Sequence, residues 1–226
     1  MMTNPRQCWL PRLDRALAVY VLTDRALSRG RSEIDVVREA IDGGASAIQL
    51  RWKEKSLHDA VPVARALQEL CRERDVLFVV NDRVDLALAI DADAVHVGED
   101  DLPVRETRAI VGDRMIVGYS PPTLDDAPLA EKLGADYLGV GPVYGTSTKD
   151  DAGEAVGVER IKAVCARITI PVVGIGGISA HNAGPVIAAG AAGVAVVSSV
   201  VAQKDIAVAT NQLRHAVDRA LAGRSE

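Results

Sequence analysis

Short runs of apolar residues alternate with longer amphipathic stretches along most of the chain. The runs are four or five residues long and rich in Val, Ile, Leu and Ala, whereas the longer stretches space their apolar residues as in a helix. This pattern predicts β-strands that alternate with α-helices. We expect strands at 18–22, 47–50, 76–80, 94–97, 115–119, 137–140, 171–175 and 193–197, and helices at 34–42, 57–74, 84–90, after Pro103, and at 123–133, 158–167, 182–189 and 206–222.

Eight strand-helix units predict a single-domain α/β protein, a closed (β/α)8 TIM barrel formed by residues 16–226. Regular alternation of strands and helices implies a parallel sheet, and 226 residues is a common length for one such barrel. A doubly wound open sheet is the alternative, but no G-x-G-x-x-G follows the first strand. Residues 1–15 are predicted to form a polar, poorly ordered N-terminal extension.

The composition narrows the class of protein and of partner. Hydrophobic residues make up 48% but aromatic residues only 3%, which suits a core of aliphatic parallel strands covered by helices. A net charge of −5 without a basic face argues against nucleic acid as a partner. Cys8, Cys71 and Cys165 lack metal or disulfide spacing, which favours a cytoplasmic location. No stretch has the length of a membrane span or the pattern of a signal peptide, so no membrane association is expected.

Polar residues and glycines follow most of the predicted strands. In a (β/α)8 barrel the carboxyl ends of the strands meet at one mouth, where the active site is built. We therefore predict that these residues line one small-molecule site, because anion-binding groups at six strand ends are hard to assign to chance. In chain order they are Gln49, Arg51, Lys53, Asn81, Asp82, Asp101, Ser120, Thr146, Thr148, Lys149, Gly176, Gly177, Val197 and Ser198.

One half of this site is suited to a pyrophosphate. Arg51 and Lys53 are two residues apart in an extended segment and so lie on one side of it, and Asn81 adds an amide. Asp82 and Asp101 add carboxylates, which are the ligands that Mg²⁺ needs where it bridges phosphate oxygens.

The other half is suited to a monophosphate. The stretch 136–149 runs from a buried strand through Gly139, Gly141 and Gly145, which leave room for a ligand or another backbone, into a loop of hydroxyls. The loop ends in Lys149, a point charge that can hold an anion beside Gly177 and Ser198. Two phosphorylated ligands and one magnesium ion indicate a transferase that joins them.

Each residue also has a plain structural alternative. The hydroxyl loop is typical of a solvated turn, and Arg51 and Lys53 taken singly resemble ordinary surface charges. Asp82 and Asp101 each precede a helix and could be N-caps. His96 lies near a strand end, where a packed imidazole is commoner than a catalytic one.

Five motifs in order resemble the thiamine phosphate synthase family. They are Q-L-R-x-K at 49–53, N-D-R-V-D at 81–85, H-V-G-x-x-D at 96–101, G-P-V-x-x-T-x-T-K at 141–149 and I-G-G-I at 175–178. Together they cover the chain from Tyr20 to Val201, and the combination is specific although each motif alone is weak.

The resemblance implies a reaction and a role for each residue. The pyrophosphate ester of 4-amino-5-hydroxymethyl-2-methylpyrimidine would be bound by Gln49, Arg51, Lys53 and Asn81, with Ser120 near the pyrimidine and Mg²⁺ on Asp82 and Asp101. Thiazole phosphate would be held by Thr146, Thr148, Lys149, Gly177, Val197 and Ser198. Pyrophosphate would leave first, a pyrimidine-methyl cation would form, and the thiazole nitrogen would attack it. Arg51, Lys53, Ser120 and Lys149 would be the catalytic residues of this dissociative reaction.

Two departures and two rivals accompany the resemblance. Glu99 stands where the family usually has Gln, and Gly145 where it usually has Pro. A related barrel that aromatises the thiazole phosphate uses a histidine after the fifth strand, but here that segment is Tyr119–Pro122 and contains none. A non-catalytic sensor of phosphorylated ligands is the rival from another class. A homo-oligomer is compatible with the sequence.

Overall fold

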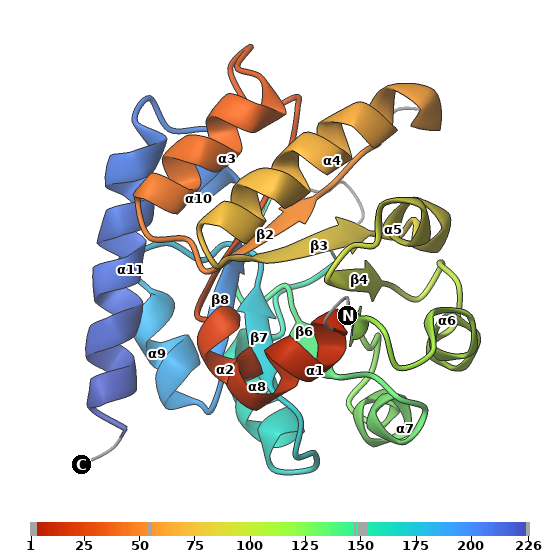
Figure 1. The fold of residues 1–226 in the computed structure, drawn as a ribbon. Helices are drawn as coiled ribbons and strands as arrows, with labels where there is room; N and C mark the ends of the chain where they lie inside the picture. The colour runs from red at the N-terminus through yellow and green to blue at the C-terminus, as the bar shows by residue number, and fades with distance from the viewer. Residues whose placement is uncertain (1–3, 54–55, 147, 149–152, 225–226) are drawn as a thin grey trace.

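The computed structural model describes residues 4–53, 56–146, 148 and 153–224. Eight parallel strands close into one barrel, in which each strand pairs with the next along the chain and β1 pairs with β8. The predicted single-domain (β/α)8 barrel is therefore confirmed, and the open-sheet alternative is wrong (Figure 1). The strands are β1 Val19–Leu22, β2 Ala47–Leu50, β3 Leu77–Asn81, β4 Ala94–Val97, β5 Ile116–Tyr119, β6 Tyr137–Val140, β7 Val172–Ile175 and β8 Gly193–Val196.

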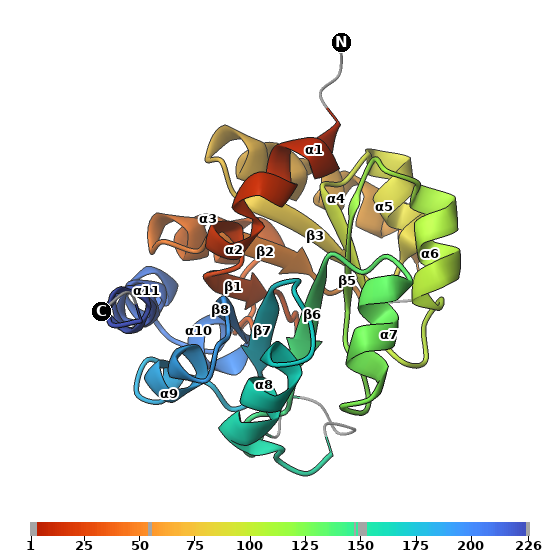
Figure 2. The same ribbon diagram turned by 90° about the horizontal axis from the view of Figure 1, so that it is seen from below.

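Helices surround the barrel, as Figure 2 shows. The helices at 33–42 and 206–222 begin with a side-chain cap: the hydroxyl of Ser32 accepts a hydrogen bond from the backbone of Asp35, and Asp205 caps the last helix in the same way. No helix in the described part of the chain is both long and apolar enough to cross a membrane. The helices after β1 are α3 Glu33–Asp42, α4 Leu57–Glu73, α5 Val84–Ile90, α6 Val104–Val111, α7 Asp126–Lys132, α8 Gly157–Cys165, α9 Ala183–Ala188, α10 Ser198–Val201 and α11 Ile206–Ala222.

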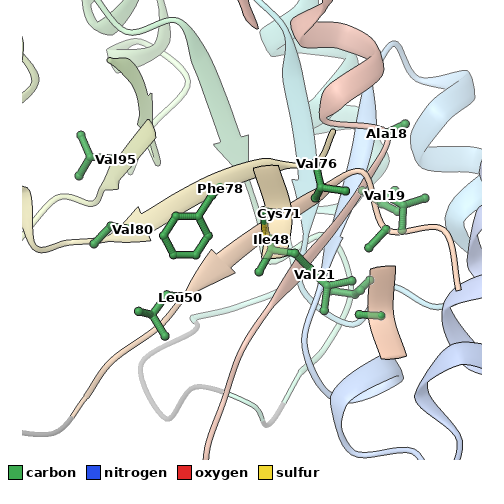
Figure 3. Packing of buried hydrophobic residues seen from close by; sticks show 14 of the residues in the cluster. Ala18, Val19, Val21, Ile48, Leu50, Cys71, Val76, Phe78, Val80 and Val95 are labelled. Atoms are coloured by element: carbon green, nitrogen blue, oxygen red, sulfur yellow. The ribbon is translucent and has the colours of Figure 1, made fainter. Parts of the chain in front are cut away.

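Alternate residues of each strand enter two separate hydrophobic clusters. The outer cluster packs the strands against the helices and includes Ile48, Leu50, Phe78 and Val80 (Figure 3). The inner cluster fills the barrel, and alanines from several strands make up part of it. Small side chains leave space inside the barrel, and two tyrosines described below cross it. The inner residues that bear on the site are Tyr20, Ala47, Ala94, Tyr137 and Ala195.

The N-terminal segment differs from the predicted polar extension. Residues 4–16 form α1 Pro5–Trp9, the 3-10 turn η1 Leu10–Arg12 and α2 Leu13–Ala16. Trp9 and Leu13 are buried in the inner cluster, so α1 and α2 close the amino-terminal end of the barrel (Figures 1 and 2). The expectation of poor order is wrong for this segment, because the apolar residues that it carries cover an otherwise open end of the barrel.

An ion network fastens the same segment to the barrel. The guanidinium of Arg6 donates to both carboxylate oxygens of Asp136, at 2.8 Å in the closest contact. Asp136 is buried beside β6, pairs also with Arg108, and accepts a hydrogen bond from the backbone of Val117. Because every partner of this buried carboxylate is charged or a backbone donor, its desolvation is offset.

Candidate active site

A cavity of about 740 Å³ opens at the carboxyl ends of the strands. Its walls come from all eight strand ends, which is the position predicted for the site. The predicted residues that line it are Gln49, Lys53, Asn81, Asp82, Asp101, Ser120, Thr146, Thr148, Gly176, Gly177, Val197 and Ser198. Arg51 is not among the residues that line the cavity, and Lys149 lies outside the described residues.

Two carboxylates and one ammonium group lie together at the ends of β3 and β4. Lys53 Nζ is 3.2 Å from an Asp82 carboxylate oxygen. Asp82 has a φ of 63°, a left-handed conformation that side chains other than glycine adopt rarely, and its N–H donates to the carbonyl oxygen of His96. Backbone strain of this kind is common at functional sites, where the surrounding structure holds it.

The electrostatics of Asp101 differ from those of an exposed carboxylate. Burial raises its pKa above the ordinary value, the N–H of Gly98 opposes this rise, and the nearby charge of Asp82 adds to it. The N–H of Gly98 donates to Asp101 Oδ2 at 2.8 Å. A carboxylate whose pKa is raised by a neighbouring carboxylate marks a place where a cation is favoured.

The helix-cap alternative for these two aspartates is wrong. Helix α5 has Arg83 at its N-cap and α6 has Pro103, and neither N-cap side chain accepts a hydrogen bond from its helix. Asp82 and Asp101 precede these caps and line the cavity instead. Within the described ranges no group of three or more His, Cys, Asp or Glu residues could hold a metal, so this site offers two carboxylates.

Arg51 lies at the edge of the site, in contact with a residue that the sequence analysis did not select. Its Nη1 donates to Asp24 Oδ2 at 2.5 Å, and both side chains are largely buried. Asp24 lies two residues after the end of β1 and also accepts a hydrogen bond from the N–H of Leu27, so it is held in place. Arg51 Nε is buried with no hydrogen-bond partner among the described residues. One N–H of the guanidinium is therefore unpaired within the described part of the chain.

The opposite wall carries hydroxyls and glycines. Thr148 Oγ1 donates to Ser198 Oγ at 3.2 Å, which links the loop after β6 to the start of α10. Gly176 and Gly177 have φ values of 95° and 66°, and a Cβ on Gly177 would meet the carbonyl oxygen of Gly145 at 2.6 Å. Any larger residue at Gly177 would push this loop away from the cavity.

The glycines of the stretch 136–149 have different roles. A Cβ on Gly141 would collide with the carbonyl oxygen of Ile175 on β7, as the prediction of close backbone approach requires. A Cβ on Gly139 would meet side-chain atoms of His96 and Ser120 at 3.2 Å. Among the described residues nothing lies within 4 Å of a Cβ on Gly145, so no neighbouring backbone requires a glycine there, and close approach of a ligand stays a prediction.

A chain of hydrogen bonds crosses the barrel beneath the cavity. Gln49 Nε2 donates to the hydroxyl of Tyr20, which is 3.0 Å from the hydroxyl of Tyr137. That hydroxyl is 3.0 Å from His96 Nδ1, and His96 Nε2 is 2.8 Å from Ser120 Oγ. The five residues come from β1, β2, β4 and β6 and from the end of β5. We call them the polar relay.

Sequence reasoning found only the two ends of the polar relay, Gln49 and Ser120. The sequence favours a packed imidazole at His96 and places the two tyrosines in strands without a role in the site. Their common signal is that Tyr20, His96 and Tyr137 all have side chains on the inner side of their strands. Burial raises the pKa of both tyrosines, so each hydroxyl keeps its proton.

Comparison with known proteins identifies the family of this chain. The family model described as thiamine monophosphate synthase matches residues 19–200. The thiamine-phosphate synthases of Moorella thermoacetica and Haloarcula marismortui are each 48% identical, over 89% of this chain and 96% and 97% of their own lengths. The solved thiamine phosphate pyrophosphorylase of Pyrococcus furiosus superimposes with a TM-score of 0.86 at 42% identity, covering 93% of this chain and all of that one. The chain therefore belongs to the thiamine monophosphate synthase family.

Proposed function

We propose that this chain joins the pyrophosphate ester of 4-amino-5-hydroxymethyl-2-methylpyrimidine to thiazole phosphate, releasing thiamine phosphate and pyrophosphate. The observation that carries the proposal is the division of one cavity into two unlike walls. Lys53, Asp82 and Asp101 lie on one wall, and Thr146, Thr148 and Ser198 lie on the other. The similarity of 48% identical relatives named thiamine-phosphate synthase supports the same reaction.

The first wall suits a leaving pyrophosphate. Lys53 supplies a cation and Asn81 supplies amide donors at this wall. Arg51, whose buried Nε lacks a hydrogen-bond partner among the described residues, is assigned to the same pyrophosphate. Since charge accumulates on the leaving group in the transition state, donors fixed in advance at this position lower the barrier. Asp24 contributes by fixing the guanidinium of Arg51.

Asp82 and Asp101 fit Mg²⁺ on the basis of their chemistry. This ion is usually held by one or two carboxylates and completed by water and substrate phosphate oxygens, and the wall offers two such groups beside each other. Bound there, Mg²⁺ would supply positive charge to the oxygens of the pyrophosphate. Glu99 and Asp100 also line the cavity, so the acidic side of this wall is larger than the two predicted ligands.

The pyrimidine is assigned to the floor between the two walls. Gln49 Oε1 is buried with no hydrogen-bond partner among the described residues, and leaving a buried acceptor unpaired costs about 1–3 kcal/mol. The amino group of the pyrimidine is a donor of the kind that this oxygen lacks. Ser120, at the end of β5, presents its hydroxyl to the same cavity.

The second wall is assigned to thiazole phosphate. Hydroxyls of Thr146, Thr148 and Ser198 are donors for phosphate oxygens, and the backbone at Gly177 can approach closely. Val197 and Ser198 lie where β8 passes into α10, so the N–H groups at the start of that helix add further donors. Lys149, outside the described residues, is assigned to the same phosphate.

The proposed reaction is dissociative. The residues of the first wall stabilise the departing pyrophosphate, a pyrimidine-methyl cation forms on the floor, and the thiazole nitrogen attacks it with its free lone pair. The floor excludes water, because Tyr20 and Tyr137 close it from below and both are buried. No side chain has to act as nucleophile or general base in this scheme.

A single assay tests the function. Purified protein receives the pyrimidine pyrophosphate, thiazole phosphate and Mg²⁺, and thiamine phosphate and pyrophosphate are measured. We expect equal amounts of the two products, formed only when both substrates and the metal are present. Binding of both ligands without product would favour a sensor, and isomerisation of a thiazole precursor in the absence of Mg²⁺ would favour a tautomerase.

A further inference from the structure

We infer that the hydrogen bonds of the polar relay run in one fixed direction, so that the cavity presents an acceptor at Gln49 and a donor at Ser120. This arrangement selects an aminopyrimidine over the corresponding oxopyrimidine. Tyr20, Tyr137 and His96 then act as positioning residues, through Gln49 and Ser120. The inference rests on the proposed function for the identity of the substrate, but the direction of the relay is a property of the protein alone.

The direction follows from the proton count of each group. An amide nitrogen can only donate, so Gln49 Nε2 makes the hydroxyl of Tyr20 an acceptor. The single proton of Tyr20 then points to the hydroxyl of Tyr137, 3.0 Å away. The proton of Tyr137 in turn points to His96 Nδ1, also at 3.0 Å, which leaves that nitrogen without a proton in the neutral ring.

The same proton count decides which end of the relay donates into the cavity and which end accepts. Neutral His96 with a bare Nδ1 carries its proton on Nε2, which donates to Ser120 Oγ at 2.8 Å. The hydroxyl proton of Ser120 is therefore free to donate into the cavity. At the other end the Nε2 atom of Gln49 is occupied, so its unpartnered Oε1 can only accept.

Burial makes a broken relay unfavourable. Both tyrosines are at most 2% exposed, so water cannot replace a missing partner. An unpaired buried hydroxyl costs about 1–3 kcal/mol, which keeps the chain of hydrogen bonds intact. Burial also raises the pKa of both phenols, so neither loses the proton on which the direction depends.

Two glycines provide the space that the relay needs. A Cβ on Gly118 of β5 would collide with the ring of Tyr137 and with His96 Nδ1. A Cβ on Gly139 of β6 would meet His96 Cε1 and Ser120 Oγ, each at 3.2 Å. Because both strands lack a side chain here, the phenol and the imidazole can meet in the barrel.

The donor and acceptor at the two ends match one ring chemistry. A 4-aminopyrimidine offers an amino donor beside a ring nitrogen that accepts, which is complementary to Gln49 Oε1 and the hydroxyl of Ser120. A 4-oxopyrimidine reverses both groups, because its oxygen accepts and its adjacent ring nitrogen carries a proton. A site built to bind one pattern rejects the other strongly, since buried polar groups are then left unpaired.

The first test measures the relay without any substrate. Nitrogen-15 NMR of labelled wild-type protein reports which ring nitrogen of each histidine carries the proton. The spectrum is recorded at about pH 8, where imidazole is ordinarily neutral. The signal that is missing from the spectrum of His96→Asn is the signal of His96. We expect His96 with its proton on Nε2. A proton on Nδ1 would overturn the inference whether or not the protein is a synthase.

The second test measures selectivity in Tyr137→Phe and Tyr20→Phe, with Tyr119→Phe as the matched control outside the relay. We expect the ratio of kcat/KM for the aminopyrimidine pyrophosphate over its oxo analogue to fall about tenfold or more in the first two variants. The KM for thiazole phosphate should not change. An unchanged ratio in both variants would overturn the inference, whereas absence of product with the wild type would overturn the proposed function instead.

Discussion

Asp24 holds Arg51 by a 2.5 Å ion pair between the ends of β1 and β2, where both side chains are largely buried. The sequence analysis assigned Arg51 to the pyrophosphate and did not select Asp24. The ion pair fixes the guanidinium in one position, so the contribution of Arg51 depends on a second residue. Positioning of this kind reduces the entropy that a flexible arginine would lose when it binds an anion.

Asp24→Asn tests this dependence, because it removes the charge while an amide oxygen can still accept from the N–H of Leu27. We expect the KM for the pyrimidine pyrophosphate to rise about tenfold, equivalent to ~1.4 kcal/mol, with the KM for thiazole phosphate unchanged. The double variant with Arg51→Ala should be no worse than Arg51→Ala alone. Additive effects of the two changes would contradict a shared role. Asp35→Asn, in an exposed ion pair with Arg38, is the control.

The two carboxylates of the first wall should control the dependence on metal. Asp82→Ala or Asp101→Ala should reduce turnover by ~10²–10³, the range typical of one preorganised electrostatic group, and should raise the Mg²⁺ concentration needed for half-maximal rate. Asp59→Ala, on the exposed side of α4, should leave both quantities unchanged. If the native protein kept full activity in EDTA, the metal assignment would have to be abandoned.

The two walls should separate the substrates kinetically. Lys53→Ala should raise the KM for the pyrimidine pyrophosphate, because it removes the cation beside Asp82. Thr148→Val removes a hydroxyl at nearly constant volume and should raise the KM for thiazole phosphate, and we expect Lys149→Ala to do the same. Each KM should rise by about ten- to a hundredfold, in keeping with loss of a charge-assisted hydrogen bond worth about 1.5–3 kcal/mol. Similar effects of all three changes on both substrates would mean that the cavity is not divided as proposed.

The N-terminal segment should contribute to the free energy of unfolding and should not change the KM for either substrate. Trp9→Ala removes a side chain that is 7% exposed at the closed end of the barrel, so we expect a loss of ~3–5 kcal/mol in the free energy of unfolding. Leu10→Ala, at a residue that is 40% exposed in the same segment, should cost much less. Thermal unfolding followed by circular dichroism compares the two. Equal stability of both variants, or a changed KM in Trp9→Ala, would contradict this role.

Local pattern alone determined most of the fold. Runs of apolar residues with polar ends predicted all eight strands, and Ser32 predicted the start of α3, the helix after β1. Both predictions succeed because strand propensity and helix capping depend on neighbours within a few residues. The order of strands and helices then allowed few topologies, since parallel strands need crossovers of one hand. The motifs after the strands could be placed at one mouth for the same reason.

Tertiary structure decided what those residues contact. Tyr20 and Tyr137 are 117 positions apart and meet only because the barrel closes with both on its inner side. Asp24 became visible as the partner of Arg51 only once β1 and β2 lay side by side. Trp9 and Leu13 are spaced as on one face of a helix, but only the open end of the barrel makes them core residues. Burial and long-range hydrogen bonds depend on which surfaces meet in space, and no local pattern contains that information.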